Sequence, residues 1–424
     1  MMPINPAIIF IGAGVVMAAS PRHLRNILSL LIPLMALWQL LLIPSNFSYS
    51  LNVFDFTLQP LRMDALSFIF ALIFIIVSFI IAIFSLHKDA RLEQATIQLY
   101  AGSAIGAVLC GDLISLFVFF ELGAITSAAI VYFGHSQQAT QAALRYFLIH
   151  VAAGLMLLVG ILMHYSTHGS LLFANMRLGE TGSTFIFIAF GIKCAFPLLH
   201  NWLQDAYPKA SAAGSVALSA FTTKLAVYCL ARGFAGTEAL IWIGAAMTAF
   251  PIFFAVIEND LRRVLSYSLN NQLGFMVVGI GIGTSLSLNG TAAHAFCHIL
   301  YKALLFMSMG AVLHRIGTTR ASQLGGLHKS MPWTAAFCII GAMSISAFPL
   351  LSGFVSKGII LYSAAEEGLW IIWLILLFAS AGVLDHSGIK VPFFAFFAHD
   401  AGYRCKEAPL NMLIAMGLAA FACI

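Results

Sequence analysis

The sequence places five charged side chains inside long apolar stretches: Glu121, Lys193, Lys224, Lys302 and Lys357. A charge at the centre of a membrane-spanning helix costs about 2.5–3.5 kcal/mol on insertion scales, so structure alone seldom accounts for it. Desolvation lowers the pKa of a lysine and a neighbouring carboxylate raises it. These residue types at this depth therefore predict groups that bind and release protons in a hydrated interior. Glu121 is the one acid clearly at that depth.

Two alternatives stay open for these charges. A lysine near a helix end can extend its ammonium to the lipid headgroups, and this reading applies best to Lys224. Glu121 can instead complete a buried polar network without exchanging protons.

The segment TAAHAFCHILYKALLFM places His294, His298 and Lys302 four residues apart. On a helix this spacing puts all three on one face, over about 12 Å at a rise of about 1.5 Å per residue. Such a row is suited to relaying protons through intervening water. The HxxxH pair is also half of a metal site, but no third ligand lies nearby in the sequence. We therefore expect no metal and, because the seven cysteines are scattered singly, no cofactor.

Helix-breaking residues accompany two of the lysines. Pro197 follows Lys193 in GIKCAFPLLHNW, and Pro349 and Gly353 precede Lys357 in SAFPLLSGFVSKG. Broken helices survive in membranes where they are buried in protein or line water. A proline kink without a role is common, but a pair of interrupted helices in two halves of a chain is typical of inverted repeats around an ion site.

The elements that must position these residues are membrane helices. The chain has 424 residues, of which 61% are apolar and 9% charged, against about 25% charged in an average soluble domain. This composition excludes a soluble enzyme, a disordered chain and a nucleic-acid-binding role for the net charge of +5. Apolar windows predict an all-α polytopic membrane protein with about 13–14 transmembrane helices. The stretch between residues 45 and 61 alternates apolar and polar residues and predicts an interfacial or extracytoplasmic β-like segment.

Basic residues in the loops predict the orientation, because cytoplasmic loops are enriched in Lys and Arg. With the N-terminus outside, the outer loops hold only Arg62, Arg177 and Arg232. The cytoplasmic loops then hold Arg22, Arg25, Lys88, Arg91, Arg145, Lys209, Arg262, Arg263, Arg315, Arg320, Lys329, Lys390, Arg404 and Lys406.

Four segments resemble the proton-conducting membrane transporter family. They are GIKCAFPLLHNWLQDAYPKASAAGSVALSAFTTKLAVY, ENDLRRVLSYSLNNQLGF, HAFCHILYKALLF and PLLSGFVSKGIIL. The family comprises antiporter-like subunits of respiratory complex I and large subunits of multisubunit (Mrp-type) Na+/H+ antiporters. The resemblance spans roughly residues 60–420, and HSGIKVPFFAFFAHDAG looks closer to the D-type antiporter subunit.

The resemblance implies an architecture and roles for the buried residues. It implies N-terminal helices in 1–95, inverted five-helix repeats in 96–235 and 236–385, each with a broken helix, and a cytoplasmic loop with the start of a truncated last helix in 386–424. Glu121 resembles the glutamate that pairs with Lys193, and Lys224 resembles the lysine that links the two half-channels. Lys357 resembles the twelfth-span residue, which is Lys or Glu across the family, and His294, His298 and Lys302 resemble the family's eleventh-span polar row.

We therefore expect a proton-translocating subunit of a cation/proton antiporter, exchanging H+ for Na+ or K+ in the bacterial inner membrane with other membrane subunits as partners. The alternative is a proton-pumping, antiporter-like subunit of an NADH-quinone oxidoreductase, and only there would the chain be part of a translocating enzyme. A third hypothesis is an inert membrane subunit, because the sequence stops inside the last apolar run. No redox, hydrolytic or nucleic-acid-binding motif is expected to act in this chain.

Overall fold

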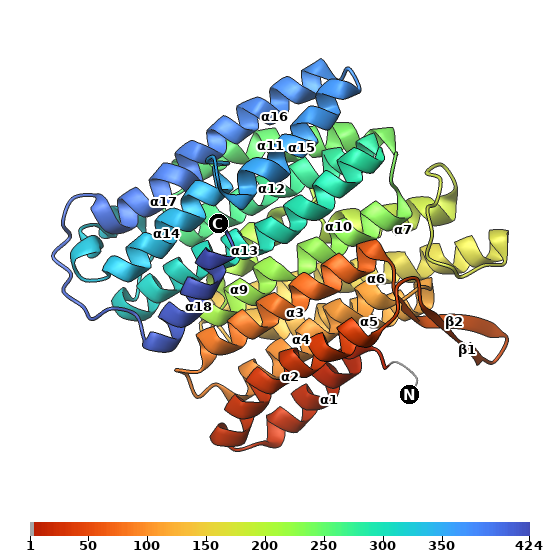
Figure 1. Ribbon diagram of the computed structural model, residues 1–424, viewed down its shortest axis with the longest axis horizontal. Coiled ribbons are helices and arrows are strands. Elements are labelled where there is room, and N and C mark those ends of the chain that lie inside the picture. The colour runs from red at the N-terminus through yellow and green to blue at the C-terminus, as the bar shows by residue number, and fades with distance from the viewer. Residues whose placement is uncertain (1–3) are drawn as a thin grey trace.

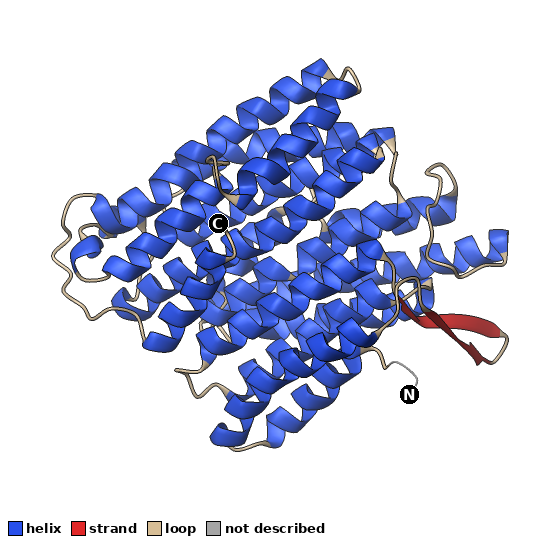
Figure 2. Cartoon of the chain, in the orientation of Figure 1, coloured by secondary structure: helices blue, strands red, loops and turns tan. Residues whose placement is uncertain are grey.

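The computed structural model describes residues 4–424 as a bundle of long helices with one small β-hairpin (Figures 1 and 2). The first half contains α1 (Pro6–Ala19), α2 (Arg22–Leu42), β1 (Ser48–Val53), β2 (Phe56–Arg62), α3 (Ala65–Ser85), α4 (Arg91–Leu109), α5 (Leu113–Tyr132), α6 (Gln137–His168), α7 (Thr181–Lys193), α8 (Asn201–Ala206), η1 (Tyr207–Lys209), α9 (Ala212–Ala220) and α10 (Thr222–Gly233).

The second half continues with α11 (Glu238–Ile257), α12 (Leu261–Ile282), α13 (Ser285–Ile316), η2 (Ala321–Gln323), η3 (Leu327–Lys329), α14 (Pro332–Ile345), α15 (Ser352–Glu366), α16 (Trp370–Val383), η4 (Leu384–Ile389), α17 (Lys390–Pro392), η5 (Phe393–Phe397) and α18 (Leu410–Phe421). The long helix α13 lies near the middle of the bundle and packs against α3, α9, α12, α14, α15 and α18 (Figure 1).

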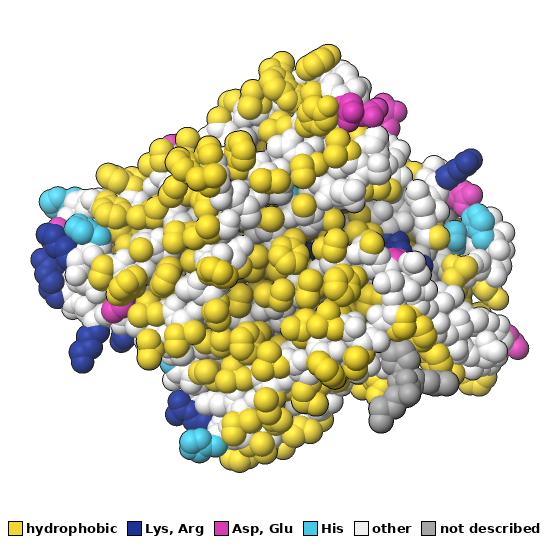
Figure 3. All heavy atoms as spheres, viewed as in Figure 1, with side chains coloured by type: hydrophobic (Ala, Val, Ile, Leu, Met, Phe, Trp, Pro, Cys, Tyr) yellow, Lys and Arg dark blue, Asp and Glu magenta, His cyan; other side chains and the backbone are white. Residues whose placement is uncertain are grey.

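The helices are those of a multi-pass membrane protein. Within residues 4–424, eight helical segments are long and apolar enough to cross a membrane, and four shorter helices are also apolar. Large apolar side chains such as Trp38, Leu162 and Ile371 are exposed on the outside of the bundle. Figure 3 shows yellow apolar side chains over the middle of this face, with most dark blue Lys and Arg side chains toward its ends. Such a surface is suited to lipid rather than water.

The predicted β-like segment is confirmed as an antiparallel hairpin. Strand β1 pairs with β2 from Ser48 opposite Arg62 to Val53 opposite Phe56. Asp112 fixes this hairpin to the bundle, because its carboxylate accepts hydrogen bonds from Gln59 N and from Ser115 N, both at 2.7 Å. The second bond is a helix N-cap that starts α5. The hairpin and the loop from α6 to α7 lie at the same end of the bundle (Figure 1).

Two helices are interrupted by the same five residues, AFPLL. The first copy (195–199) separates α7 from α8, and the second (347–351) separates α14 from α15. Ala195 and Ala347 have φ of 60° and 57°, and Leu198 and Leu350 have φ of 71° and 73°. Non-glycine residues rarely adopt positive φ, so the agreement at both positions marks one backbone motif used twice. Pro197 and Pro349 lie within these two segments.

The helical structure continues without a break beyond the end of α16. The chain continues through the π-helical turns η4 and η5 to Phe397. Within this extension His386 and Ser387 are buried, and the Ser387 hydroxyl donates to Ser268 Oγ at 2.8 Å. π-Helical turns are rare and occur frequently at functional sites.

Candidate functional site

Lys193 occupies a closed position between α5 and α7. Its ammonium, 2% exposed, donates to the Phe120 carbonyl at 2.7 Å and lies 3.2 Å from the centre of the Phe120 ring. Lys193 is the last residue of α7, where the negative end of the helix dipole favours a cation. The carbonyl, the ring and the helix end all stabilise the charged form of this side chain.

Glu121 lies next to Phe120 on α5 and is half-buried. Its carboxylate interacts electrostatically with Lys193, but among residues 4–424 the two groups form no direct ion pair. Atom Oε1 of Glu121 has no hydrogen-bond partner within the described chain. Glu121 and Lys193 are therefore close enough to interact electrostatically but are not in direct contact.

Gly154 on α6 provides the space that the Glu121 carboxylate occupies. A Cβ atom at Gly154 would lie 1.6 Å from Glu121 Oε1 and 2.5 Å from its Cδ. Any other residue at this position would force the carboxylate to move. One turn earlier on the same helix, the buried His150 stacks on Tyr146 at 3.9 Å and contacts Trp202 edge-on at 4.6 Å.

Lys224 lies at the junction of α9 and α10 in the middle of the bundle. Its ammonium is fully buried and donates to the Ser219 carbonyl at 2.7 Å, just before the helix break at Phe221. The side chain does not extend to the surface, so the geometry does not match the lipid-headgroup alternative. It interacts electrostatically with His294, His298 and Lys302.

The polar row on α13 is buried as one face of the helix. His294, His298 and Lys302 are each 0% exposed. His294 Nδ1 lies 3.0 Å from Ser356 Oγ, and the two imidazole rings stack with centroids 6.1 Å apart. Within the described part of the chain, neither His298 nitrogen nor the Lys302 ammonium has a hydrogen-bond partner. Buried polar groups normally have a hydrogen-bond partner, so these side chains are positions at which bound water is expected.

Lys357 lies on α15, the helix that follows the second AFPLL segment, and interacts electrostatically with His294 of this row. Its ammonium donates to the carbonyl of Ile345, the last residue of α14, at 2.7 Å and lies 5.3 Å from the Phe275 ring. Gly353 lies in the first turn of α15 and allows α15 to approach α14 closely, because a Cβ there would be 1.9 Å from the Ser344 carbonyl oxygen.

His386 extends the buried groups beyond the positions singled out in the sequence. This residue on η4 is 0% exposed and interacts electrostatically with Lys302, Lys357 and Lys390. Among the described residues its Nε2 atom has no partner. Lys390, one turn further, lines an open pocket of about 470 Å³. The sequence signal was the HSGIKVP segment, which draws attention as a family likeness but not as a site.

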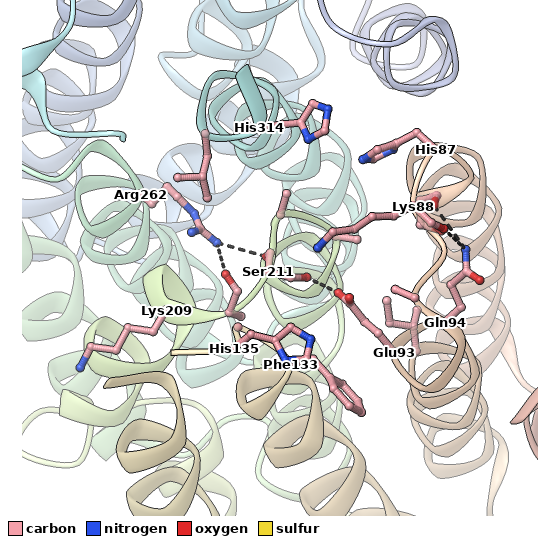
Figure 4. Close-up of a pocket in the computed structure, with 18 residues that line it drawn as sticks. His87, Lys88, Glu93, Gln94, Phe133, His135, Lys209, Ser211, Arg262 and His314 are labelled. Carbon is pink, nitrogen blue, oxygen red and sulfur yellow. Dashed lines mark hydrogen bonds between the residues drawn. The ribbon is translucent and has the colours of Figure 1, made fainter. Parts of the chain in front are cut away.

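A second pocket, of about 360 Å³, opens at the end of α4 (Figure 4). Glu93 accepts a hydrogen bond from Ser211, and Arg262 donates to the Pro208 and Ala210 carbonyls at 2.7 Å each. His87 contacts His314 with ring centroids 4.9 Å apart. Burial, together with the positive charge of a protonated His314, lowers the pKa of His87.

One face of α4 leads from this pocket towards Lys193. Glu93 and Ile97 line the pocket, and Tyr100 one turn deeper lines a small cavity of about 10 Å³ together with Thr222 and Lys193. Tyr100 and Thr222 are hydrogen-bonded. A cavity of this size holds about one water molecule. Tyr100 and Thr222 thus lie beside the cavity that the Lys193 ammonium also lines, about one turn of α4 beyond the pocket residue Ile97.

Comparison with known proteins identifies the fold and the family. The sequence profile described as "NADH:quinone oxidoreductase/Mrp antiporter, TM" matches residues 110–382. The chain is similar to the D-type subunit of the Na+/H+ antiporter of Alkalihalophilus pseudofirmus, at 34% identity over 69% of this chain and 63% of that protein. It is also similar to the N-type subunit of the NADH-quinone oxidoreductase of Desulforudis audaxviator, at 33% identity over 65% of this chain and 59% of that protein.

The fold is shared with a chain of the Mrp complex from a Dietzia species, with a TM-score of 0.90, 21% identity, and coverage of 99% of this chain and 92% of that chain. The chain spans less than two thirds of the length of the two curated relatives named above. The profile match covers more than half of the chain, so this protein belongs to the NADH:quinone oxidoreductase/Mrp antiporter transmembrane family.

Proposed function

We propose that this chain is a proton-translocating subunit of a multisubunit Na+/H+ antiporter. The observation that carries the proposal is the buried sequence of exchangeable groups from Glu121 and Lys193 through Lys224 to the α13 row and Lys357. Lys193 and Lys357 each donate to one backbone carbonyl. Lys224 donates to the Ser219 carbonyl and at 3.4 Å to the Thr223 hydroxyl, and Lys302 has no partner among the described residues. A structural charge would be enclosed by several hydrogen bonds, whereas these groups are left free to exchange protons with water.

Electrostatic repulsion between the buried groups provides a mechanism for moving a proton along the row. Lys224 interacts with both histidines and with Lys302, and like charges in a poorly screened interior repel. A proton arriving at one group therefore favours release from the next. Approach of the Glu121 carboxylate to Lys193 favours a proton at that end, and its withdrawal favours transfer inward.

The proposed architecture has about 13–14 membrane crossings with the N-terminus outside the bacterial inner membrane. It comprises N-terminal helices in 1–95, two inverted five-helix repeats in 96–235 and 236–385, and a C-terminal part in 386–424. The recurrence of AFPLL with matching φ angles supports the two repeats. In this orientation the pocket beside Glu93 is the cytoplasmic opening that leads to Lys193.

A second candidate function is the proton-pumping subunit of an NADH-quinone oxidoreductase. The observation in its favour is the 33% identity to an N-type oxidoreductase subunit, close to the 34% identity to a D-type antiporter subunit. The partners would be antiporter subunits in the first case and respiratory subunits in the second.

The test is Na+-driven collapse of a pH gradient in everted vesicles that contain the chain with its co-expressed partner subunits. We expect Glu121→Gln and Lys193→Ala each to reduce exchange by more than about tenfold, because each removes an exchangeable group from the only proposed route. Lys406→Ala is the matched control, since Lys406 is exposed on a loop far from the row. Immunoblots of the vesicles check that every variant inserts equally.

The outcomes separate the proposals. Full exchange in either site variant contradicts the proposed route. A wild-type complex that moves protons only with NADH and quinone, and never with a Na+ gradient, contradicts the antiporter and supports the second candidate.

A further inference from the structure

Two histidines and a glutamate meet where α6 ends and α7 begins. His164 and His168 lie one turn apart on the last turns of α6, and Glu180 immediately precedes α7. One ligand atom from each residue lies within 4.8 Å of the other two. These residues are separate from the buried lysine row, at the end of the bundle that carries the β-hairpin (Figure 1).

One edge of this cluster has the length found in a tetrahedral metal site. His168 Nε2 and Glu180 Oε2 are 3.4 Å apart. Two ligands bound at about 2.0–2.1 Å to a tetrahedral zinc ion are about 3.3 Å apart, so this edge already has the required length. The His164 and His168 rings stack with centroids 4.4 Å apart, and His164 offers a ligand atom within 4.8 Å of those of the other two residues.

Each of the three side chains has a ligand atom that is free to bind a metal. His168 Nδ1 donates to the His164 carbonyl at 3.2 Å, which leaves the lone pair of Nε2 free for a metal. His164 Nδ1 is buried and has no partner within residues 4–424. The side chain of Glu180 makes no capping hydrogen bond to α7, so its carboxylate is free to turn towards the histidines.

The loop between the helices is also held in place. Leu113 N donates to the Leu171 carbonyl at 2.9 Å, Phe173 N to the Gly111 carbonyl at 2.8 Å, and Met176 N to the Gly233 carbonyl at 2.7 Å. These bonds order the loop that brings Glu180 next to the end of α6. Metal binding therefore costs little conformational entropy of this loop.

We propose that His164, His168 and Glu180 bind a divalent transition-metal ion of the zinc type, with water at the remaining position. Two imidazoles and one carboxylate are a ligand set that suits zinc and leaves one coordination site open. The bound ion links the C-terminal end of α6 to the N-terminal end of α7. These are the helices that carry Gly154 and Lys193, although metal binding itself does not depend on the proposed transport function.

The experiment measures zinc binding to the purified, chelator-treated chain, produced without a polyhistidine tag. Equilibrium dialysis with metal analysis should give one ion per chain at micromolar free Zn2+. Removing one ligand should weaken binding by at least about tenfold, the loss typical of even indirect partners of a metal. His168→Ala and Glu180→Gln are the site variants, and His23→Ala, an exposed histidine elsewhere, is the matched control.

A stability measurement supplies a second readout. Zinc should raise the Tm of the wild type and of His23→Ala, because a ligand that binds only the folded state stabilises it. Glu180→Gln should fold normally without zinc and should show little of this rise. Equal zinc affinity in His168→Ala, Glu180→Gln and wild type would overturn the proposal, and so would the absence of binding to wild type at micromolar zinc.

Discussion

Gly154 offers a direct test of whether the position of the Glu121 carboxylate controls transport. In Gly154→Ala the new methyl group would lie 1.6 Å from Glu121 Oε1, so the oxygen must retreat by about 2 Å to reach an ordinary contact of about 3.5 Å. The backbone has no reason to change, because alanine is a better helix former than glycine by about 1 kcal/mol. The substitution therefore moves a charge without removing it.

The size of the effect follows from Coulomb's law. Where the whole displacement of about 2 Å separates unit charges that start about 4 Å apart, the attraction between Glu121 and Lys193 weakens by about 1.4 kcal/mol at an effective dielectric constant of about 20, and any other direction of displacement gives a smaller loss. A larger starting separation gives a smaller loss, so about tenfold is the upper bound for the fall in exchange. Gly154→Ala should thus lie between wild type and Glu121→Gln.

The assay is Na+-dependent collapse of the pH gradient in everted vesicles, with Gly12→Ala as the control. A Cβ at Gly12 in α1 meets no atom within 4 Å among the described residues, so exchange should not change. The shorter Glu121→Asp side chain relieves the contact, so the double variant with Gly154→Ala should lose less than the two single losses combined. Wild-type exchange in Gly154→Ala, with exchange lost in Glu121→Gln, would refute the reasoning.

Two further predictions concern the second half of the chain. Ala347→Gly should stabilise the protein by about 1 kcal/mol, because alanine at positive φ is strained, whereas Ala335→Gly inside α14 should destabilise it by a similar amount. Thermal unfolding of the purified variants measures both, and a lower Tm for Ala347→Gly would contradict the strain. His386→Phe should lower exchange by about tenfold or more if the imidazole passes protons towards Lys390, while the exposed control His399→Phe should not. Unchanged exchange in His386→Phe would remove this residue from the route.

Much of the fold follows from the sequence because lipid imposes a simple rule. A long apolar window must be helical, and a charge inside it must face protein or water, so the buried lysines could be named without knowing their neighbours. The alternation in residues 45–61 likewise predicted a β-like segment, and the structure forms it as the hairpin of β1 and β2. Lys193, Lys224, Lys302 and Lys357 are all buried in the structure.

The remaining features depend on neighbours that are distant in the sequence. Gly154 looks like any helix glycine until Glu121, on another helix, is placed against it. The Phe120 carbonyl that binds Lys193 is likewise invisible to a pattern of side chains. His164 and His168 repeat the HxxxH spacing noted at His294 and His298, but their third ligand lies beyond a helix end and a loop. Sequence spacing could therefore have flagged the pair, but only the fold joins it to Glu180.

The two interrupted helices use one backbone motif for two different electrostatic tasks. Lys193 precedes its break and is bound to a neighbouring helix, beside a half-buried carboxylate that Gly154 leaves room to move. Lys357 follows its break and is bound to the carbonyl end of α14, among imidazoles and other lysines. Within the described chain, α11–α16 contain no buried acid, so a proton there is governed by repulsion between cations rather than by attraction to a carboxylate. On the route proposed above, a proton that enters beside Glu121 would therefore be attracted in the first half and repelled in the second, and this difference would give transport a direction.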